Sequence, residues 1–254
     1  MERPTRQRLR TQLALVSPGT DLRDGLDRIV SGRTGALIVL GSTGPVDALV
    51  TGGFPIDVPL TATALRELAK LDGAILLDSS LTRIIHAGAH LMPDAALPTA
   101  ETGTRHRTAD RVARQTGVPV VTVSASMSSI ALFLDGYRHP LQRPEQLLTR
   151  ADQALATLSR YRDRLTEAAS RLTSLEVQDA VTVEDVTVVA RRIELCRRLG
   201  EEVSDILVEL GSEGRMVELQ LQELLAGVAE TGAALARDYG TGDSRLRLDE
   251  LAGL

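Results

Sequence analysis

The residues best suited to bind an anion follow one another in one short segment of the chain. A glycine, a threonine hydroxyl, a histidine and two arginines occur together as Gly103, Thr104, Arg105, His106 and Arg107. The pattern that follows predicts a helix with Thr104 as its N-cap. Free backbone N–H groups at a helix N-terminus and charge-assisted donors both favour a polyphosphate. Short basic clusters are also common in solvated turns, so a phosphate site is one of two interpretations here.

A second candidate site is Asp72, Gly73 and Ala74, where a predicted helix ends and an apolar strand begins. A carboxylate at this boundary can hold Mg²⁺ or Mn²⁺ beside a nucleotide hydroxyl. Gly73 would let a ligand approach the backbone closely. An Asp-Gly pair between two elements is also typical of an ordinary turn, so this motif does not decide the function alone.

A third candidate is the run of serines from Ser124 to Ser129, which follows a predicted strand ending at Val123. Hydroxyl groups at the end of a sheet strand often contact a ligand in an open α/β sheet, and a plain polar loop is the equal alternative. Three histidines lack the paired spacing of a metal site, and we interpret them as surface or structural residues. They are His86, His90 and His139.

The elements that must position these side chains form a mixed α/β pattern between Leu37 and Leu134. The predicted strands are Ala36–Leu40, Ala74–Leu77, Arg83–Ala87, Pro119–Val123 and Ile130–Leu134. The predicted helices span 5–16 and 21–30, then run from an N-cap at Thr61 to Leu71, and from Thr104 to near Gly117.

After Pro144 the pattern becomes helical throughout. Apolar or small residues recur in alternating steps of four and three, at Leu147, Ala151, Ala154, Leu158, Tyr161, Leu165, Ala168, Leu172 and Leu175. This is a heptad seam along one long helix. Two similar runs follow, and Cys196 lies on the second seam as a small buried side chain. Three long helices with short joints predict an antiparallel bundle, with Gly240 as a helix C-cap and no clear apolar face after it.

Composition narrows the possible functions. The chain has 254 residues, 43% of them hydrophobic, which suits one catalytic domain with an accessory region. Its net charge of −5 and aromatic content of 2% disfavour a nucleic-acid channel. A single cysteine excludes an intrachain disulfide. No apolar run is long enough for a signal peptide or a membrane span, so we expect a cytoplasmic protein without a membrane partner.

Taken together, the Asp72-Gly73-Ala74 motif, the Gly103–Arg107 segment and the serine loop resemble the diadenylate cyclase domain. Two further segments, Leu65–Lys70 and Thr149–Leu155, resemble more narrowly the DisA-type cyclases. The resemblance implies an α/β, mixed-sheet cyclase domain with flanking helices over residues 1–142. An all-α, three-helix spine would follow over residues 143–254.

The resemblance also implies an activity, in which two ATP molecules condense to cyclic di-AMP across a dimer interface and release two pyrophosphates. Asp72 would hold the Mg²⁺ or Mn²⁺ and help to activate a ribose 3′-hydroxyl, while Gly73 and Ala74 lie against the nucleotide. Residues from Gly103 to Arg107 would bind the triphosphate, with Arg105, His106 and Arg107 acting in catalysis. Ser124 would contact phosphate and Leu91 would flank adenine.

The partners implied are ATP and further copies of the chain, as an octamer in this family. DisA-type proteins carry a C-terminal helix-hairpin-helix domain that binds branched DNA, which we expect to be absent from this chain, so that no nucleic acid is expected as a partner. The alternative is an oligomeric protein that senses ATP without turnover. Asp72 argues against that alternative, because a protein that only binds nucleotide could lose the metal carboxylate.

Overall fold

The structure is a computed structural model and describes residues 5–240. Contacts between residues divide the chain into two compact units, Met1–Arg143 and Pro144–Leu254. The division falls one residue after the expected domain boundary, just before a proline that begins a long helix. The first unit is α/β and the second is helical, which is the fold class that the sequence predicts.

The α/β unit is built on a mixed sheet with the strand order β2-β5-β4-β1-β6-β7-β8, and β3 also pairs with β5. Strands β1 and β4 are parallel, and the other pairs are antiparallel. The strands are β1 (Ala36–Val39), β2 (Val50–Thr51), β3 (Phe54–Pro59), β4 (Ala74–Leu77), β5 (Arg83–Leu91), β6 (Val120–Ser124), β7 (Ser129–Leu134) and β8 (Tyr137–Pro140).

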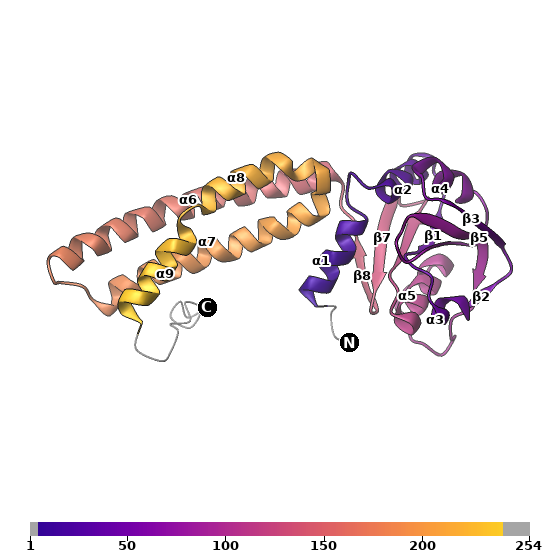
Figure 1. Cartoon of the computed structure of the whole chain (residues 1–254), viewed down its shortest axis with the longest axis horizontal. Helices are drawn as coiled ribbons and strands as arrows, with labels where there is room; N and C mark the ends of the chain where they lie inside the picture. The colour runs from indigo at the N-terminus through magenta and orange to yellow at the C-terminus, as the bar shows by residue number, and fades with distance from the viewer. Residues whose placement is uncertain (1–4, 241–254) are drawn as a thin grey trace. The chain divides into compact units, whose positions relative to one another are not determined.

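Helices cover both faces of this sheet (Figure 1). On one face, α5 contacts β1, β6 and β7 and closes a core that includes Leu37, Val39 and Phe133. Helices α2 and α4 pack against each other on the opposite face, where α2 contacts β6 and β7. The helices of this unit are α1 (Arg6–Leu15), α2 (Asp21–Ser31), α3 (Gly44–Asp47), α4 (Ala62–Leu68) and α5 (Thr104–Thr116).

The sequence predicted five of these strands: β4 at its observed bounds, β1, β6 and β7 to within one residue at each end, and β5 with an end four residues too early, at Ala87 instead of Leu91. The N-cap at Thr61 is confirmed, because its hydroxyl accepts a hydrogen bond from the N–H of Ala64. The N-cap assigned to Thr104 is wrong by one residue. Gly103 is the N-cap of α5, with φ −81° and ψ 140°, and Thr104 is the first helical residue.

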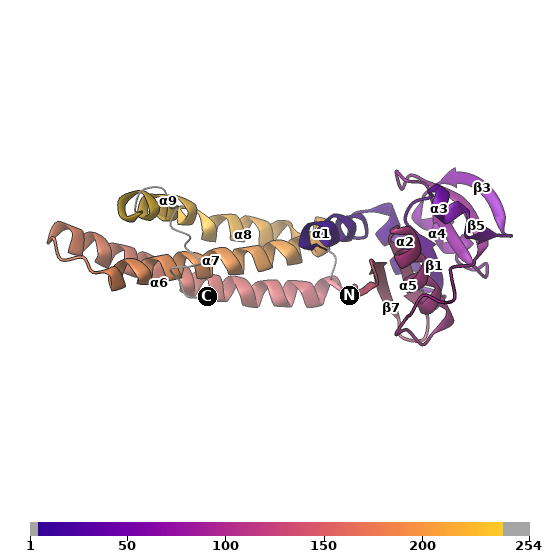
Figure 2. The ribbon, with the colours of Figure 1, turned by 90° about the horizontal axis from the view of Figure 1, so that it is seen from below.

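The helical unit contains α6 (Pro144–Val177), α7 (Val183–Leu210), a 3-10 turn (Gly211–Gly214), α8 (Arg215–Leu225) and α9 (Val228–Tyr239). Helices α6 and α7 run antiparallel, with α8 beside them in both views (Figures 1 and 2). The expected third helix is divided into α8 and α9 at Gly227, which has φ +79°, a conformation that favours glycine. The start of α7 is fixed by a reciprocal cap between Thr182 and Asp185.

The predicted seams form the core of this unit. Leu147, Leu158 and Leu165 are buried on α6, and they share one apolar cluster with residues of the three later helices. Cys196 is fully buried, as predicted, and burial raises the pKa of its thiol. Gly240 caps α9 by donating its N–H to the Ala236 carbonyl, and the tail predicted after it lies outside the described residues.

None of the helices within residues 5–240 has the length and apolar character needed to cross a membrane.

Candidate active site

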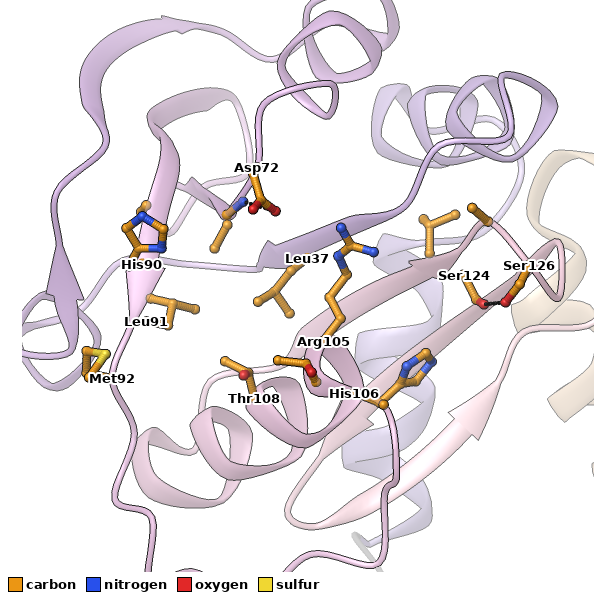
Figure 3. Close-up of a pocket in the computed structure, with 17 residues that line it drawn as sticks. Leu37, Asp72, His90, Leu91, Met92, Arg105, His106, Thr108, Ser124 and Ser126 are labelled. Carbon is orange, nitrogen blue, oxygen red and sulfur yellow. Dashed lines mark hydrogen bonds between the residues drawn. The ribbon is translucent and has the colours of Figure 1, made fainter.

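A cavity of about 670 Å³ opens on the α/β unit, where the start of α5 meets strands β1, β4, β5 and β6 (Figure 3). Nine of the ten predicted site residues line it, and they come from four separate parts of the chain, namely the three sequence motifs and Leu91 on β5. These nine are Asp72, Gly73, Ala74, Leu91, Gly103, Thr104, Arg105, His106 and Ser124. The fold therefore brings the three sequence motifs to one place.

Asp72 lies in the bend before β4, and its exposed carboxylate faces the cavity (Figure 3). Its Oδ1 accepts a hydrogen bond of 3.1 Å from the N–H of Gly73. This bond fixes the side chain beside its own backbone and leaves Oδ2 free of any hydrogen bond to the described residues. The carboxylate is thus open to a ligand or a cation.

Gly73 has a structural reason to be glycine besides the one predicted. Its φ of +107° is rarely adopted by other residues. A Cβ at this position would lie 2.7 Å from the Ala89 carbonyl oxygen and 2.7 Å from the Gly88 carbonyl carbon. Gly73 therefore allows the bend that carries Asp72 to pass directly over β5, whether or not a ligand approaches.

The start of α5 is open to an anion. Gly103 provides no side-chain cap, and the first turn has no acidic residue that would compete for the backbone N–H groups. Arg105 is exposed, lines the cavity and forms neither a hydrogen bond nor a salt bridge with any residue from 5 to 240. An unpaired guanidinium at a helix N-terminus is a favourable arrangement for phosphate.

His106 packs its ring edge-on against the ring of Phe133, with the centroids 5.9 Å apart. Burial lowers the pKa of its imidazole, and the positive charge of Arg138 adds to this effect. Arg138 is itself paired with Glu101, at 3.3 Å. The imidazole is therefore neutral near pH 7 and can both donate and accept a hydrogen bond.

Arg107 is the one predicted site residue that does not line the cavity. It lies two residues after Arg105 in the first turn of α5, and its side chain is exposed and has no partner among the described residues. Helical geometry explains the difference, because residues two positions apart point in directions about 200° apart, so the two arginines cannot share one face. A triphosphate contact by Arg107 stays a prediction.

Ser124 ends β6 and is nearly buried, at 8% exposure. Its hydroxyl lies 3.3 Å from the hydroxyl of Ser126 and accepts a 3.4 Å hydrogen bond from the N–H of Met127. Ser126 also lines the cavity, whereas Ser128 and Ser129 do not. The serine loop is thus partly a cavity wall and partly an ordinary turn.

Ala125 and Ser126 of the candidate serine loop also line the cavity, and six further residues line it without having been predicted, namely Leu37, Ala89, His90, Met92, Thr108 and Val123. His90 is exposed, as the surface interpretation expects, and its ring also faces the cavity opposite α5 (Figure 3). Thr108 lies one helical turn after Thr104, a spacing that could have been used to predict it. Leu37 and Val123 carried no signal, since apolar strand residues are ordinary core residues.

The polar groups that line the cavity suit a metal ion that is shared with a substrate. Asp72 is the one carboxylate among the lining residues that the structure describes. Across residues 5–240, no group of three or more His, Cys, Asp or Glu side chains could hold a metal by itself. Mg²⁺ is usually bound through one or two carboxylates together with substrate phosphates. The donor set therefore fits a cation that arrives with a nucleotide.

The fold and the cavity place this chain in a class of two-part proteins, with a nucleotide-binding domain and a helical linker. Residues 23–138 match the model of the DisA bacterial checkpoint controller nucleotide-binding domain. Residues 141–252 match the model of the DisA bacterial checkpoint controller linker region.

The chain belongs to the DisA family. It is 52% identical over 251 residues to the DNA integrity scanning protein DisA of Kineococcus radiotolerans, covering 97% of this chain and 70% of that protein. The DisA of Acidothermus cellulolyticus is 54% identical, with coverage of 94% of this chain and 65% of the relative. The DisA of Streptomyces coelicolor is 55% identical, with coverage of 91% and 62%. The chain thus spans roughly two thirds of the length of these relatives.

Among solved structures, a double mutant of DacA from Staphylococcus aureus is 22% identical with a TM-score of 0.41, covering 52% of this chain and 88% of that chain. A hypothetical membrane spanning protein from Bacillus cereus is 25% identical with a TM-score of 0.43, covering 48% and 62%.

Proposed function

We propose that this chain is a diadenylate cyclase, which condenses two ATP molecules into cyclic di-AMP and releases two pyrophosphates. The observation that carries the proposal is one cavity in which an open carboxylate, Asp72, and an unpaired guanidinium, Arg105, come together at an uncapped helix start. Membership of the DisA family supports the same activity, through its nucleotide-binding domain.

The proposed reaction needs two nucleotides in two facing cavities. The 3′-hydroxyl oxygen of each ATP attacks the α-phosphorus of the other, and the bond from that phosphorus to the β-phosphate bridging oxygen breaks. Each hydroxyl proton leaves through the Asp72 carboxylate, and each pyrophosphate takes the electron pair of the broken bond. Two such attacks close the ring, so a single cavity cannot complete the product.

Each group that lines the cavity has a distinct role in the proposed reaction. Arg105 and the backbone N–H groups of the first turn stabilise the charge that develops on the leaving pyrophosphate. The neutral His106 donates a hydrogen bond without adding charge, and Thr104 and Ser124 supply hydroxyl donors. Leu91 covers the adenine ring. Asp72 would hold Mg²⁺ or Mn²⁺, which neutralises phosphate charge and makes the attacking hydroxyl easier to deprotonate.

The test is to incubate the purified chain with ATP and either Mn²⁺ or Mg²⁺ and to search for cyclic di-AMP by mass spectrometry. We expect cyclic product with at least one of the two metals, and none without metal. ATP binding without any product would instead support the alternative function, an oligomeric nucleotide sensor. Failure to bind ATP at all would contradict both functions.

The proposal requires more than one copy of the chain in the active species, and by family resemblance the assembly would be an octamer. Light scattering combined with the cyclase assay tests this, because activity should fall as the protein is diluted below the dissociation constant of the assembly. A strictly monomeric and fully active enzyme would contradict the proposed reaction.

We also propose that this chain does not bind branched DNA tightly. It has 29 basic residues against 34 acidic ones, and DNA binding depends on several unpaired cations along one surface. In the helical unit, Arg197 and Arg198 are both paired with Glu194. A gel shift with a four-way junction at about 150 mM salt tests the proposal, and a complex at submicromolar protein would contradict it.

A further inference from the structure

Gly35 lies immediately before β1, at the point where β6 ends beside it. The two strands are antiparallel, with Ala36 opposite Val123, so Gly35 lies at the level of Ser124. Gly35 is partly buried and does not itself line the cavity, whereas Val123 and Ser124 do. It therefore lies just behind the wall of the site.

The space that a side chain at residue 35 would fill is occupied by the guanidinium of Arg105. A Cβ built on Gly35 would overlap the Nη1 of Arg105 and lie 2.9 Å from its Cζ. A Cβ contact below 3.0 Å is essentially never seen in real structures. Gly35 also has no positive φ, so its backbone conformation is open to other residues. The third atom close to such a Cβ is the Val123 carbonyl oxygen on β6, at 3.3 Å, which would have to give only slightly. The guanidinium is the end of a flexible side chain, so it is the group that a side chain at residue 35 would displace.

A second arginine in the α/β unit also lies over a glycine, and the comparison shows what is unusual about Arg105 and Gly35. The guanidinium of Arg114 also lies over a glycine, Gly136, where a Cβ would be 2.5 Å from its Cζ. Arg114, however, donates to Asp110 at 2.9 Å and to the Gly136 carbonyl at 3.2 Å, so its donors are used within the protein. Gly136 has φ +74° as well, and its turn needs glycine in any case.

The Arg105 guanidinium also lies over a glycine, but it makes none of the hydrogen bonds that Arg114 makes. It is placed by packing over Gly35, and no acceptor among residues 5–240 uses its N–H groups. A guanidinium carries five N–H donors in a fixed plane and binds phosphate best when two of them act together. Placement by shape alone keeps all of these donors available to an anion while limiting the directions in which the side chain can point.

We propose that Gly35 is a positioning residue for nucleotide binding. Because it has no side chain, it leaves the space in which the Arg105 guanidinium lies, and this placement orients the guanidinium toward the phosphates. The inference rests on the proposed function only in taking Arg105 to bind the phosphates of ATP. It predicts that any side chain at residue 35 displaces Arg105 while leaving the sheet intact.

The first experiment is independent of nucleotide. A crystal structure of the Gly35→Ala variant without ligand should show the Arg105 guanidinium moved away from residue 35, while β1 and β6 shift by no more than a few tenths of an ångström at the Val123 carbonyl. Gly44→Ala is the matched control, since a Cβ at Gly44 meets nothing within 4 Å and Gly44 does not line the cavity. An Arg105 guanidinium in its original place in Gly35→Ala would overturn the inference, whatever the chain catalyses.

The second experiment is a double-mutant cycle on ATP affinity, measured by calorimetry with Mg²⁺. Gly35→Ala should weaken ATP binding by about tenfold, and Arg105→Ala by about ten- to a hundredfold, as expected for charge-assisted hydrogen bonds. In the Arg105→Ala background, Gly35→Ala should have no further effect, because the side chain that it displaces is already missing. A Gly35→Ala variant that merely folds badly would instead weaken binding equally in both backgrounds.

The outcomes separate this inference from the proposed function. Coupling between the two substitutions in ATP binding, without cyclic product from the wild-type chain, would support Gly35 as a positioning residue and contradict the cyclase proposal. Cyclic product together with independent effects of the two substitutions, or with no effect of Arg105→Ala on ATP affinity, would overturn the positioning role and leave the cyclase proposal standing.

Discussion

In the helical unit the buried carboxylate of Glu194 is held by two arginines of its own helix, whereas in the α/β unit the guanidinium of Arg105 has no acceptor among residues 5–240. Glu194 is 2% exposed and accepts hydrogen bonds of 2.7 Å from Arg197 and 2.6 Å from Arg198. The charge of this carboxylate is thus satisfied within one helix, as stability requires of a buried carboxylate.

At the cavity of the α/β unit the charged side chains are not paired. Asp72 and Arg105 both face it, and neither is paired with an opposite charge there. Unpaired charges at a cavity contribute little to folding and are available to a ligand of complementary charge. The difference separates two uses of charge: Glu194 is paired within its helix, whereas Asp72 and Arg105 are left open at the cavity, where we propose that they bind a nucleotide.

The largest effect that would test this difference is expected for Asp72→Asn. The carboxylate is proposed to take the hydroxyl proton and to hold the metal, so its loss should lower cyclic di-AMP synthesis by at least about a hundredfold. ATP affinity should stay within about tenfold of wild type, and the melting temperature should not fall. Product formation is measured by mass spectrometry, and wild-type turnover by this variant would contradict the role of Asp72.

The next largest effect concerns Arg105 and Arg107 of α5. The sequence predicted that both bind the triphosphate, but in the structure only Arg105 lines the cavity. Arg105→Ala should weaken ATP binding by about ten- to a hundredfold, because an unpaired cavity cation is lost. Arg107→Ala should weaken ATP binding less, by about threefold, because this exposed side chain does not line the cavity and any contact that it makes with the triphosphate is screened by water. Calorimetric titration with ATP compares the two, and equal losses would show that Arg107 reaches the nucleotide.

Glu194→Gln should act on stability alone. Removing the negative charge leaves Arg197 and Arg198 without their shared partner, which should lower the free energy of unfolding of the helical unit by about 1–3 kcal/mol. The loss is measured by urea denaturation, with Glu202→Gln at an exposed position in the interior of the same helix as the control. The ATP affinity of the variant is measured under conditions in which the protein is fully folded. A change in that affinity would contradict our expectation that Glu194 acts on stability alone.

Acid should reveal the same pairing. Hydrogen bonds from Arg197, followed by those from Arg198, lower the pKa of the Glu194 carboxyl from 4.5 to about 2. Because the folded-state pKa is the lower one, this stability is fully present above about pH 4.5 and is lost as the pH falls toward 2. Urea midpoints of wild type and Glu194→Gln should therefore converge over that range, and parallel curves would contradict the assignment.

The smallest effect is expected from His106, whose pKa burial lowers from 6.5. Below about pH 6.5 the unfolded chain takes up a proton that the folded imidazole resists, so stability falls as the pH drops through this range. Between about pH 8 and pH 5.5 the melting temperature of wild type should fall by roughly 1–3 °C more than that of His106→Gln. Identical pH profiles would show that the imidazole titrates normally.

Some elements escaped prediction for identifiable reasons. Strand β3 contains Pro55 and Pro59, and proline usually argues against a strand because it lacks an N–H donor. It is tolerated here because β3 pairs on one side with β5, and the pairing shifts register between Pro55 and Val58. Strand β8 could have been predicted, since an Asp-Gly pair after an apolar strand is a strong sequence signal for a two-residue hairpin turn. In the structure Asp135 and Gly136 both have positive φ and connect β7 to β8 in this way.

By itself the sequence determined the fold class, the seams of the long helices and most of the residues that line the cavity. These features are local, since periodicity, helix starts and short motifs depend on residues close together in the chain. Only the tertiary structure decided that Arg105 and not Arg107 faces the cavity, that His90 joins the site, and that Gly35 leaves room for a guanidinium seventy positions away. Each of these depends on which face of an element meets a distant neighbour, and such contacts are set by packing rather than by local pattern.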